Sequence, residues 1–264
     1  MNSFSNKTAW VTGASSGIGE QLIYALNKSG AKVIISSRKI EDLEIVKANC
    51  QHPENIIVLP FDLANESEMV SLADHALRSD GTIDYLFNNG GISQRSMITE
   101  TRMDVYHKLM NINYFGTVAL TKAVLPYMIK KQQGKIIVIS SLMGKFASPL
   151  RSGYAAAKHA LHGFFDSLRL EMHEKNIGVL MVCPGFVKTN ISLNSVTADG
   201  TKHNQMDNAQ ESGMTAAECA AKILRAVEKD KHEVYLGGKE IYAIYLKRFL
   251  PRVLHKILLR SKVT

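Results

Sequence analysis

The stretch VTGASSGIG, residues 11–19, is the clearest indication of the fold in this sequence. It follows the apolar run TAW and carries glycines at positions 13, 17 and 19. Glycines at a strand-to-helix turn let the backbone approach a pyrophosphate, which the N–H groups at the start of the helix can bind. The spacing is Gly-x-x-x-Gly-x-Gly, not the more familiar Gly-x-Gly-x-x-Gly, so a turn that only tightens packing would also account for it.

Short apolar runs alternate with stretches of helical spacing on both sides of this loop. We expect strands at residues 8–13, 32–37, 55–61, 83–88, 135–141, 177–184 and 233–237, and long helices at 101–131 and 153–176. Such β-α-β repeats predict a parallel sheet covered by helices on both faces. The fold class is therefore α/β: a doubly wound, Rossmann-type three-layer sandwich on a mostly parallel seven-stranded sheet.

Length and composition predict one domain over residues 1–264, with 45% hydrophobic residues. The polar, weakly periodic segment 190–213 is predicted to be a substrate loop. The three cysteines form no C-x-x-C pair, which argues against a disulfide framework and a zinc knuckle, so no metal site is predicted. A reducing, cytoplasmic compartment follows.

Charge is concentrated at one end of the chain. The net charge is +8, and residues 247–264 contribute six basic side chains and no acid. No basic groove with interleaved aromatic residues is evident, so nucleic acid is not an expected partner. No signal peptide and no apolar run long enough to span a membrane is predicted.

The tail at about 241–264 alternates leucine and isoleucine with lysine and arginine. After Pro251 it can form an amphipathic helix whose basic face meets anionic lipid. Packing over the substrate pocket or a neighbouring subunit is an equally open alternative.

The segment SGYAAAKHA, residues 152–160, places a tyrosine and a lysine four residues apart. On a helix Tyr154 and Lys158 lie on one face, and a nearby cation favours the phenolate. Tyr154 is therefore a candidate general acid for a carbonyl oxygen and a general base for an alcohol. Ser140 and Ser141 end the fifth strand, where a hydroxyl could hold a substrate oxygen.

The second strand ends in Ser37, Arg38 and Lys39, where NAD-binding sheets carry an acid for the ribose hydroxyls. A guanidinium suits a 2′-phosphate, which favours NADP(H) over NAD(H). A surface arginine that opens a helix is the alternative. Asp62, after the third strand, could accept from an adenine amino group or cap the helix near Glu66.

These motifs together resemble the short-chain dehydrogenase/reductase family, in its single-domain form, over residues 7–236. TGASSGIG, NNGG, MNINYFG, the serine thirteen residues before Tyr154, YAAAK and PGFVKT occur in that family's order and spacing. NNGGISQRS and the helix after Tyr154 are similar to the branch containing dehydrogenase/reductase member seven and the 11β-hydroxysteroid dehydrogenases.

The resemblance implies a role for each matching position. Tyr154 would transfer the proton, Lys158 would lower its pKa and bind the nicotinamide ribose, and Ser141 would orient the substrate oxygen. Asn113 would hold a water in a proton relay, with Asn111 the weaker candidate. The implied cofactor contacts, together with Tyr154 and Lys158, are Gly13, Ser15, Ser16, Gly17, Ile18, Ser37, Arg38, Asp62, Leu63, Asn89, Gly90, Pro184, Gly185, Val187 and Thr189.

Two departures bear on the cofactor. NNGG replaces the commoner Asn-Asn-Ala-Gly, and Ser16 stands where many NADP-dependent members have a basic residue, so the NADP(H) prediction depends on Arg38. The expected substrate is a small, lipophilic carbonyl compound or alcohol.

Two other functions remain open, and the resemblance also implies an assembly. The alternatives are a 3-oxoacyl thioester reductase, whose basic tail would meet an acidic carrier protein, and a non-catalytic NADP(H) sensor. A homodimer or homotetramer would form through the helices that carry Asn113 and Tyr154.

Overall fold

The apolar runs form a seven-stranded sheet in the order β3-β2-β1-β4-β5-β6-β9 in the computed structural model, which describes residues 3–260. All neighbouring strands pair in parallel. The strands are β1 (Thr8–Thr12), β2 (Lys32–Ser36), β3 (Ile56–Val58), β4 (Tyr85–Asn88), β5 (Gly134–Ile139), β6 (Ile177–Pro184) and β9 (Glu233–Leu236), with β7 (Val187–Lys188) and β8 (Met214–Thr215) as a separate pair. The predicted sheet is confirmed.

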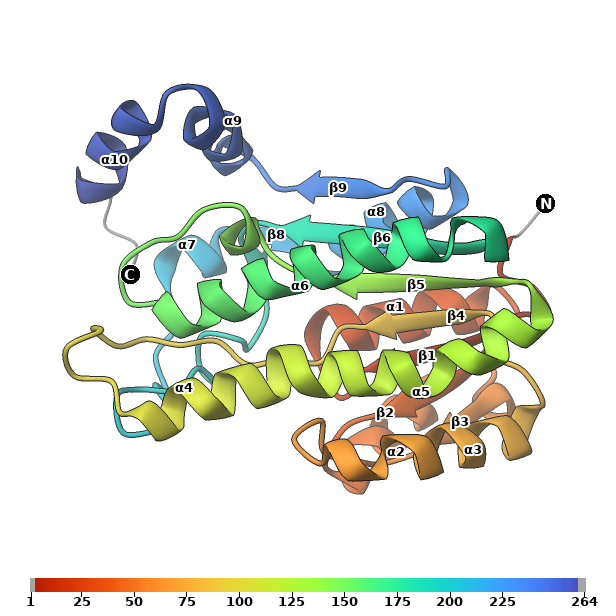
Figure 1. Ribbon diagram of the computed structural model, residues 1–264. Coiled ribbons are helices and arrows are strands. Elements are labelled where there is room, and N and C mark those ends of the chain that lie inside the picture. Colours follow the sequence, from red (N-terminus) through yellow and green to blue (C-terminus); the bar gives the residue numbers. More distant parts are fainter. Residues whose placement is uncertain (1–2, 261–264) are drawn as a thin grey trace.

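Helices cover both faces of this sheet (Figure 1). One apolar core joins it to α1 (Gly17–Lys28), α2 (Ile40–Ala48) and α8 (Ala216–Glu228). The other joins it to α3 (Met69–Asp80), α5 (Gly116–Lys131) and α6 (Ser152–Glu171). The remaining helices are α4 (Met103–Met110), α7 (Asn208–Glu211), α9 (Tyr242–Phe249) and α10 (Pro251–Arg260).

The strands explain why both faces are covered. Successive side chains of a strand point to opposite faces, and in β1 Ala9 and Val11 belong to one core while Trp10 belongs to the other. All three side chains are fully buried. The Trp10 indole donates to the Ser36 hydroxyl at 2.8 Å, so its polar atom is also satisfied.

The strand order reverses between β1 and β4, which are hydrogen-bonded neighbours although β2 and β3 lie between them in the chain. In open parallel sheets, ligands bind outside the carboxyl ends of the strands at such a switch point. The glycine loop of residues 13–19 leaves β1 at this point.

The expected helix over 101–131 is interrupted. It begins at Met103 and passes through a π-helical segment, Asn111–Phe115, before α5 begins at Gly116. Single π-helical turns occur often at functional sites because they change the direction of side chains and carbonyl groups. Here the turn contains Asn113, one of the predicted site residues.

The last two helices lie at the edge to which the strand arrows point (Figure 1). Leu254 of α10 is buried in a cluster with Leu142, Phe146 and Cys183. Packing over the body of the protein, one of the two alternatives for the tail, is therefore present in the structure for residues up to 260. Among the described helices, none is both long and apolar enough to cross a membrane.

Candidate active site

A cavity of about 540 Å³ lies at the carboxyl ends of β1, β2 and β4. The start of α1 faces it, so N–H groups of the helix terminus are available to a phosphate. Predicted residues that line it are Gly13, Ser15, Ser16, Gly17, Ile18, Ser37, Arg38, Asp62, Leu63, Asn89, Gly90 and Thr189.

The three glycines of the loop stand where a side chain would clash or would strain the backbone. Gly13 and Gly17 have φ of +63° and +62°, a conformation that L side chains rarely adopt. A Cβ on Gly13 would lie 2.8 Å from Gly90 Cα, and one on Gly19 would lie 2.2 Å from the Gly13 carbonyl oxygen. The loop is thus held at the backbone distance that a bound pyrophosphate requires.

Asn89 fastens this loop to β1. Its side-chain amide donates to the carbonyl oxygens of Thr12 and Gly13 at 3.0 and 3.2 Å. The Thr12 hydroxyl in turn accepts from the backbone N–H groups of Asn89 and Gly90 at 3.0 and 2.9 Å. The Asn89 amide, predicted to contact the adenine side of a cofactor, is therefore used to shape the loop.

Basic side chains border the end of β2 in this cavity. Arg38 and Lys39 line it, and Lys202 joins them from the substrate loop. Asp42 of α2 is an acid in the same lining. Arg38 does not open a helix, because α2 begins at Ile40 after an extended Lys39.

Asp62 is part of a turn at the rim of the cavity. Its carboxylate accepts from the Ala64 N–H at 3.0 Å. The residue at the N-cap of the following short helix, Glu66–Glu68, is Asn65, so the alternative role of Asp62 as a helix cap is wrong.

A second cavity of about 510 Å³ contains the predicted catalytic residues Ser141, Tyr154 and Lys158. The two cavities adjoin, since Ile18, Asn89, Gly91, Thr189 and Ile191 line both. Pro184, Gly185 and Val187, expected near the nicotinamide, line the second cavity.

The catalytic side chains come from β5 and α6. Tyr154 and Lys158 lie one turn apart on α6 and are 8% and 5% exposed. Ser141 follows β5 and shares a side-chain hydrogen bond with Tyr154. Ser140 bonds to His162 instead, at 3.1 Å, which agrees with Ser141 being the serine that faces the substrate.

The ammonium group of Lys158 donates to the Ile139 carbonyl oxygen at 2.7 Å, and it lies 5.7 Å from the Tyr154 ring centroid. Burial lowers the pKa of Lys158 to about 8. Burial also raises the pKa of Tyr154, against opposing contributions from Ser141, Arg95 and Arg151. In this structure burial outweighs the groups that lower the pKa of Tyr154, and the predicted effect of Lys158 on the phenol stays a prediction.

The family model for short chain dehydrogenases matches residues 7–200. The chain belongs to the short-chain dehydrogenase family. It is 43% identical over 249 residues to dehydrogenase/reductase SDR family member 7 of Homo sapiens, covering 92% of this chain and 74% of that one. It is 40% identical over 259 residues to member 7B of Mus musculus, covering 96% and 80%. The chain is thus an NAD(P)-dependent oxidoreductase by family.

Solved structures of other short-chain dehydrogenases share the architecture. One from Streptomyces avermitilis has a TM-score of 0.82 at 28% identity and covers 96% of each chain. One from Burkholderia cenocepacia, in complex with NADP, has a TM-score of 0.80 at 26% identity over 98% of this chain and 99% of that chain. A nicotinamide cofactor is therefore common to the chain's structural neighbours, and the glycine cradle fits it.

The water-binding role that the family resemblance implies for Asn113 stays a prediction, and the structure shows which of its polar groups are engaged. Its side chain is fully buried, and it accepts from the Ile92 N–H at 2.9 Å and donates to the Ile92 carbonyl at 3.0 Å. Both ends of the amide are thus occupied by backbone. A water held by Asn113 would have to contact its main-chain carbonyl group, which also accepts from Thr117 at 3.2 Å.

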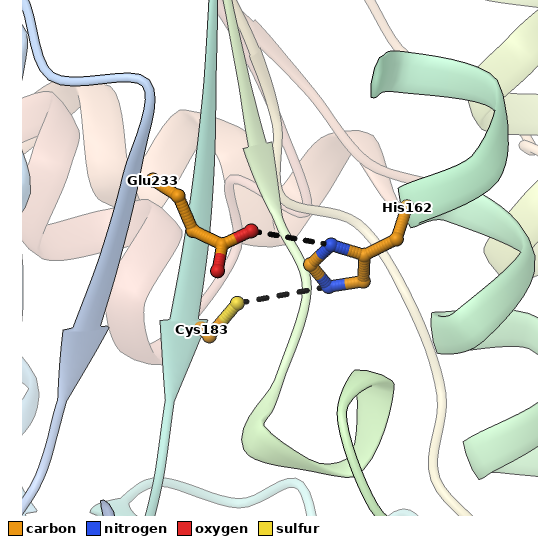
Figure 2. A group of neighbouring side chains, drawn as sticks. All are labelled: His162, Cys183 and Glu233. Carbon is orange, nitrogen blue, oxygen red and sulfur yellow. Dashed lines mark hydrogen bonds and ion pairs between the residues drawn. The ribbon is translucent and has the colours of Figure 1, made fainter. Parts of the chain in front are cut away.

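A polar group lies next to Ser140: Figure 2 shows the two imidazole nitrogens of His162 linked to the thiol of Cys183 and the carboxylate of Glu233. The distances are 3.7 Å from Nε2 to Sγ and 3.6 Å from Nδ1 to Oε2. Burial raises the pKa of Cys183 to about 12 and lowers that of His162 to about 4. Lys145 already pairs with Glu233 at 2.7 Å. His162 Nε2 also shares a hydrogen bond with the Ser140 hydroxyl, so we interpret the group as polar support for Ser140.

Several residues that line the second cavity were not predicted from the sequence. They are Arg95, Arg151, Phe146, Lys239 and Glu240. Gln210 lines it from the predicted substrate loop, and Leu246, Leu254, Ile257 and Leu258 line it from the tail, which agrees with the alternative that the tail packs over the substrate pocket. The unpredicted residues come from segments far apart in the chain, and each has an unremarkable local pattern. The tail's apolar periodicity was the one available signal.

Proposed function

We propose that this oxidoreductase transfers hydride between NADP(H) and a carbonyl or secondary alcohol group of a small lipophilic molecule, with Tyr154 as acid and base. The observation that carries the proposal is the union of the two cavities. Ser141, Tyr154 and Lys158 line one, the glycine cradle lines the other, and five residues are common to both.

The cofactor would be held by the glycine loop, by the start of α1 and by the segment from Pro184 to Thr189. Its chemistry is to supply or accept a hydride. The protein's own part is proton transfer. In reduction the Tyr154 hydroxyl donates its proton to the substrate oxygen and becomes a phenolate; in oxidation the phenolate takes the alcohol proton. Ser141 holds the same oxygen within reach of the phenol.

The preference for NADP(H) over NAD(H) rests on charge. Arg38 and Lys39 border the cavity at the end of β2, where a 2′-phosphate would be bound through charge-assisted hydrogen bonds, and Lys202 lines the same cavity from the substrate loop. Asp42 and Asp62 are acids in the lining, and they oppose the preference.

A lipophilic substrate is favoured by the walls of the second cavity. Leu142, Met143 and Phe146 line it, and they pack in one apolar cluster with leucines of α9 and α10 that line it as well. Apolar walls with a few polar groups at the reacting end are typical of sites for small lipophilic ligands. A thioester of a carrier protein is the alternative that uses the basic tail, and carrier dependence would favour it.

Contact with a membrane and self-association are further proposals. Phe249, Leu250 and Leu259 are 75%, 55% and 71% exposed beside the basic side chains of α9 and α10, so anionic lipid is a suitable surface for this face. Truncation before Lys247 would then abolish co-sedimentation with anionic liposomes. We retain a cytoplasmic location, and a homodimer or homotetramer formed through α4, α5 and α6, as predictions.

The test of the reaction is NADPH consumption over a panel of aliphatic, aromatic and steroid ketones, with NADH in parallel. Tyr154→Phe should abolish turnover while NADPH still binds, because only the proton donor is removed. The matched control is Tyr245→Phe, an exposed tyrosine of α9 that does not line the cavity. Turnover that survives in the Tyr154 variant would overturn the assignment, and tight NADPH binding without turnover by wild type would favour the sensor alternative.

A further inference from the structure

Three charged side chains that the proposed reaction does not use are buried next to it. Arg95, Arg151 and Asp207 have side chains that are 3%, 6% and 2% exposed. They come from the loop after β4, the residue before α6 and the end of the substrate loop. Charged side chains are almost never buried so deeply unless they are paired.

The carboxylate of Asp207 binds both guanidinium groups. Arg95 Nε donates to its two oxygens at 3.2 and 3.1 Å, with a further bond from Nη2, and Arg151 Nη2 donates to Oδ2 at 3.0 Å. These bonds span 112 and 56 residues of sequence, so they fasten the substrate loop to the sheet edge and to the start of α6.

The triplet carries an unbalanced charge. Two guanidinium groups and one carboxylate leave a net charge of +1. Burial and Arg95 lower the pKa of Arg151 to about 10, so it stays protonated at neutral pH. Bonds from both arginines keep the pKa of Asp207 below its ordinary value despite burial.

Both arginines belong to the cavity that holds the catalytic phenol. Arg95 and Arg151 line the same cavity as Tyr154, and both act to lower its pKa. Gln94, the neighbour of Arg95, accepts from the Gly153 and Tyr154 backbone N–H groups at 2.7 and 3.3 Å, which fixes the start of α6 against this segment.

We propose that Arg95, Arg151 and Asp207 are positioning residues, which hold the substrate loop closed and supply the net positive charge that favours the ionised form of Tyr154. The inference rests on the proposed function of Tyr154. It gives two arginines a part in the ionisation of Tyr154, beside the role predicted for Lys158.

Other polar and charged groups also lie near the phenol or line its cavity. Lys158 shares its helix, with the ammonium group directed to Ile139. Cys183 of β6 is a protonated thiol, and Ser141 is a neutral hydrogen-bond partner. Lys239 and Glu240 line the cavity from the segment before α9 and carry opposite charges.

The test uses the full chain and the pH profile of alcohol oxidation, whose acid limb follows ionisation of Tyr154. Arg151→Gln lowers the triplet charge to 0, which disfavours the phenolate, so the limb should move to higher pH. Asp207→Asn raises the charge to +2, so the limb should move to lower pH. Each shift should be on the order of one pH unit.

The double variant D207N/R151Q restores the charge to +1 while the bonds stay broken. Its acid limb should return to the wild-type position even if its substrate KM rises. Arg151→Lys keeps the charge and should leave the limb in place. Circular dichroism and NADPH binding establish that each variant is folded.

Shifts in the same direction for Arg151→Gln and Asp207→Asn would overturn the inference, because a purely structural role affects both variants alike. An unmoved limb in both would also overturn it. Neither outcome touches the proposed function, which is tested separately by the turnover of wild type and of Tyr154→Phe.

Discussion

The cofactor side and the substrate side of the site are built in different ways. The first is made of backbone and small side chains near the strand order reversal, with Gly13, Gly17 and Gly90 in its lining. The second is made of long side chains from α6, the substrate loop and the last two helices. A cofactor pyrophosphate is the same in every reaction, whereas a substrate pocket varies with its ligand.

Substitutions should therefore have different consequences on the two sides of the site. A cradle of backbone fails when any side chain is added, because no rotamer can move aside. A pocket of apolar side chains loses affinity in steps that follow the area removed. Variants on the two sides should therefore differ in size of effect and in the ligand affected.

The largest effect is expected from Gly19→Ala on the cofactor side. The new Cβ would lie 2.2 Å from the Gly13 carbonyl oxygen and 2.6 Å from the Asn89 amide, so the loop has to move. Overpacking of this kind costs about 1–3 kcal/mol. NADPH affinity, measured by fluorescence titration, should fall about 100-fold.

Gly163→Ala is the matched control for that variant. Gly163 is an exposed residue of α6, and a Cβ there meets nothing within 4 Å. Thermal unfolding should show stabilisation of about 0.5–1 kcal/mol, with NADPH affinity unchanged. Equal losses of affinity in both variants would remove the distinction between the two sides.

A smaller effect is expected from Arg38→Ala. Loss of a charge-assisted hydrogen bond to a 2′-phosphate costs about 1.5–3 kcal/mol. The ratio of kcat/KM with NADPH to that with NADH should therefore fall about 10- to 100-fold. Arg102→Ala removes an exposed arginine that pairs with Asp104 and should leave the ratio as it was. An unchanged ratio in Arg38→Ala would refute the role of Arg38.

Leu254→Ala tests the substrate side. Leu254 is 3% exposed and lines the cavity from α10, so truncation removes apolar wall from the pocket. The KM for a lipophilic substrate should rise about tenfold, since each buried methylene contributes about 0.8 kcal/mol. NADPH affinity should be constant. Leu259→Ala, on the same helix but 71% exposed, is the control. An equal rise in KM there would argue against α10 as a wall of the substrate pocket.

Sequence was sufficient for the sheet and for the residues held by local motifs. Strand periodicity gave all seven strands, and the glycine loop, Ser141, Tyr154 and Lys158 all line the two cavities. Each depends on contacts within one β-α unit or on the common edge of a parallel sheet, which the order of elements determines.

Other features could not be read from the sequence because they depend on long-range packing. The pairing of Arg95 with Asp207 joins residues 112 apart, and neither lies in a periodic pattern. The pKa of Tyr154 reflects its degree of burial, and the Asn113 amide is engaged by the backbone of Ile92. The spacing of motifs in the sequence predicts where these residues lie in the fold, but not which groups surround their side chains.

The smallest effect is expected at Asp84, which precedes β4 at the edge of the sheet opposite the two cavities. Although burial raises its pKa, hydrogen bonds from Lys131 and the Thr8 N–H lower it below the ordinary value. The ion pair between Lys131 Nζ and Asp84 Oδ1, at 2.6 Å, is partly exposed. Asp84→Asn should therefore lower the free energy of unfolding by about 1 kcal/mol at pH 7. A depressed pKa stabilises the fold above the unfolded value of about 3.9, and this contribution is lost as the pH falls through the folded pKa. Urea unfolding should therefore show the two proteins converging below about pH 4, while the KM for NADPH and for substrate stay unchanged. A difference that persists at low pH would contradict the ionic origin of the effect. A change in only one KM would show that this edge is coupled to one side of the site.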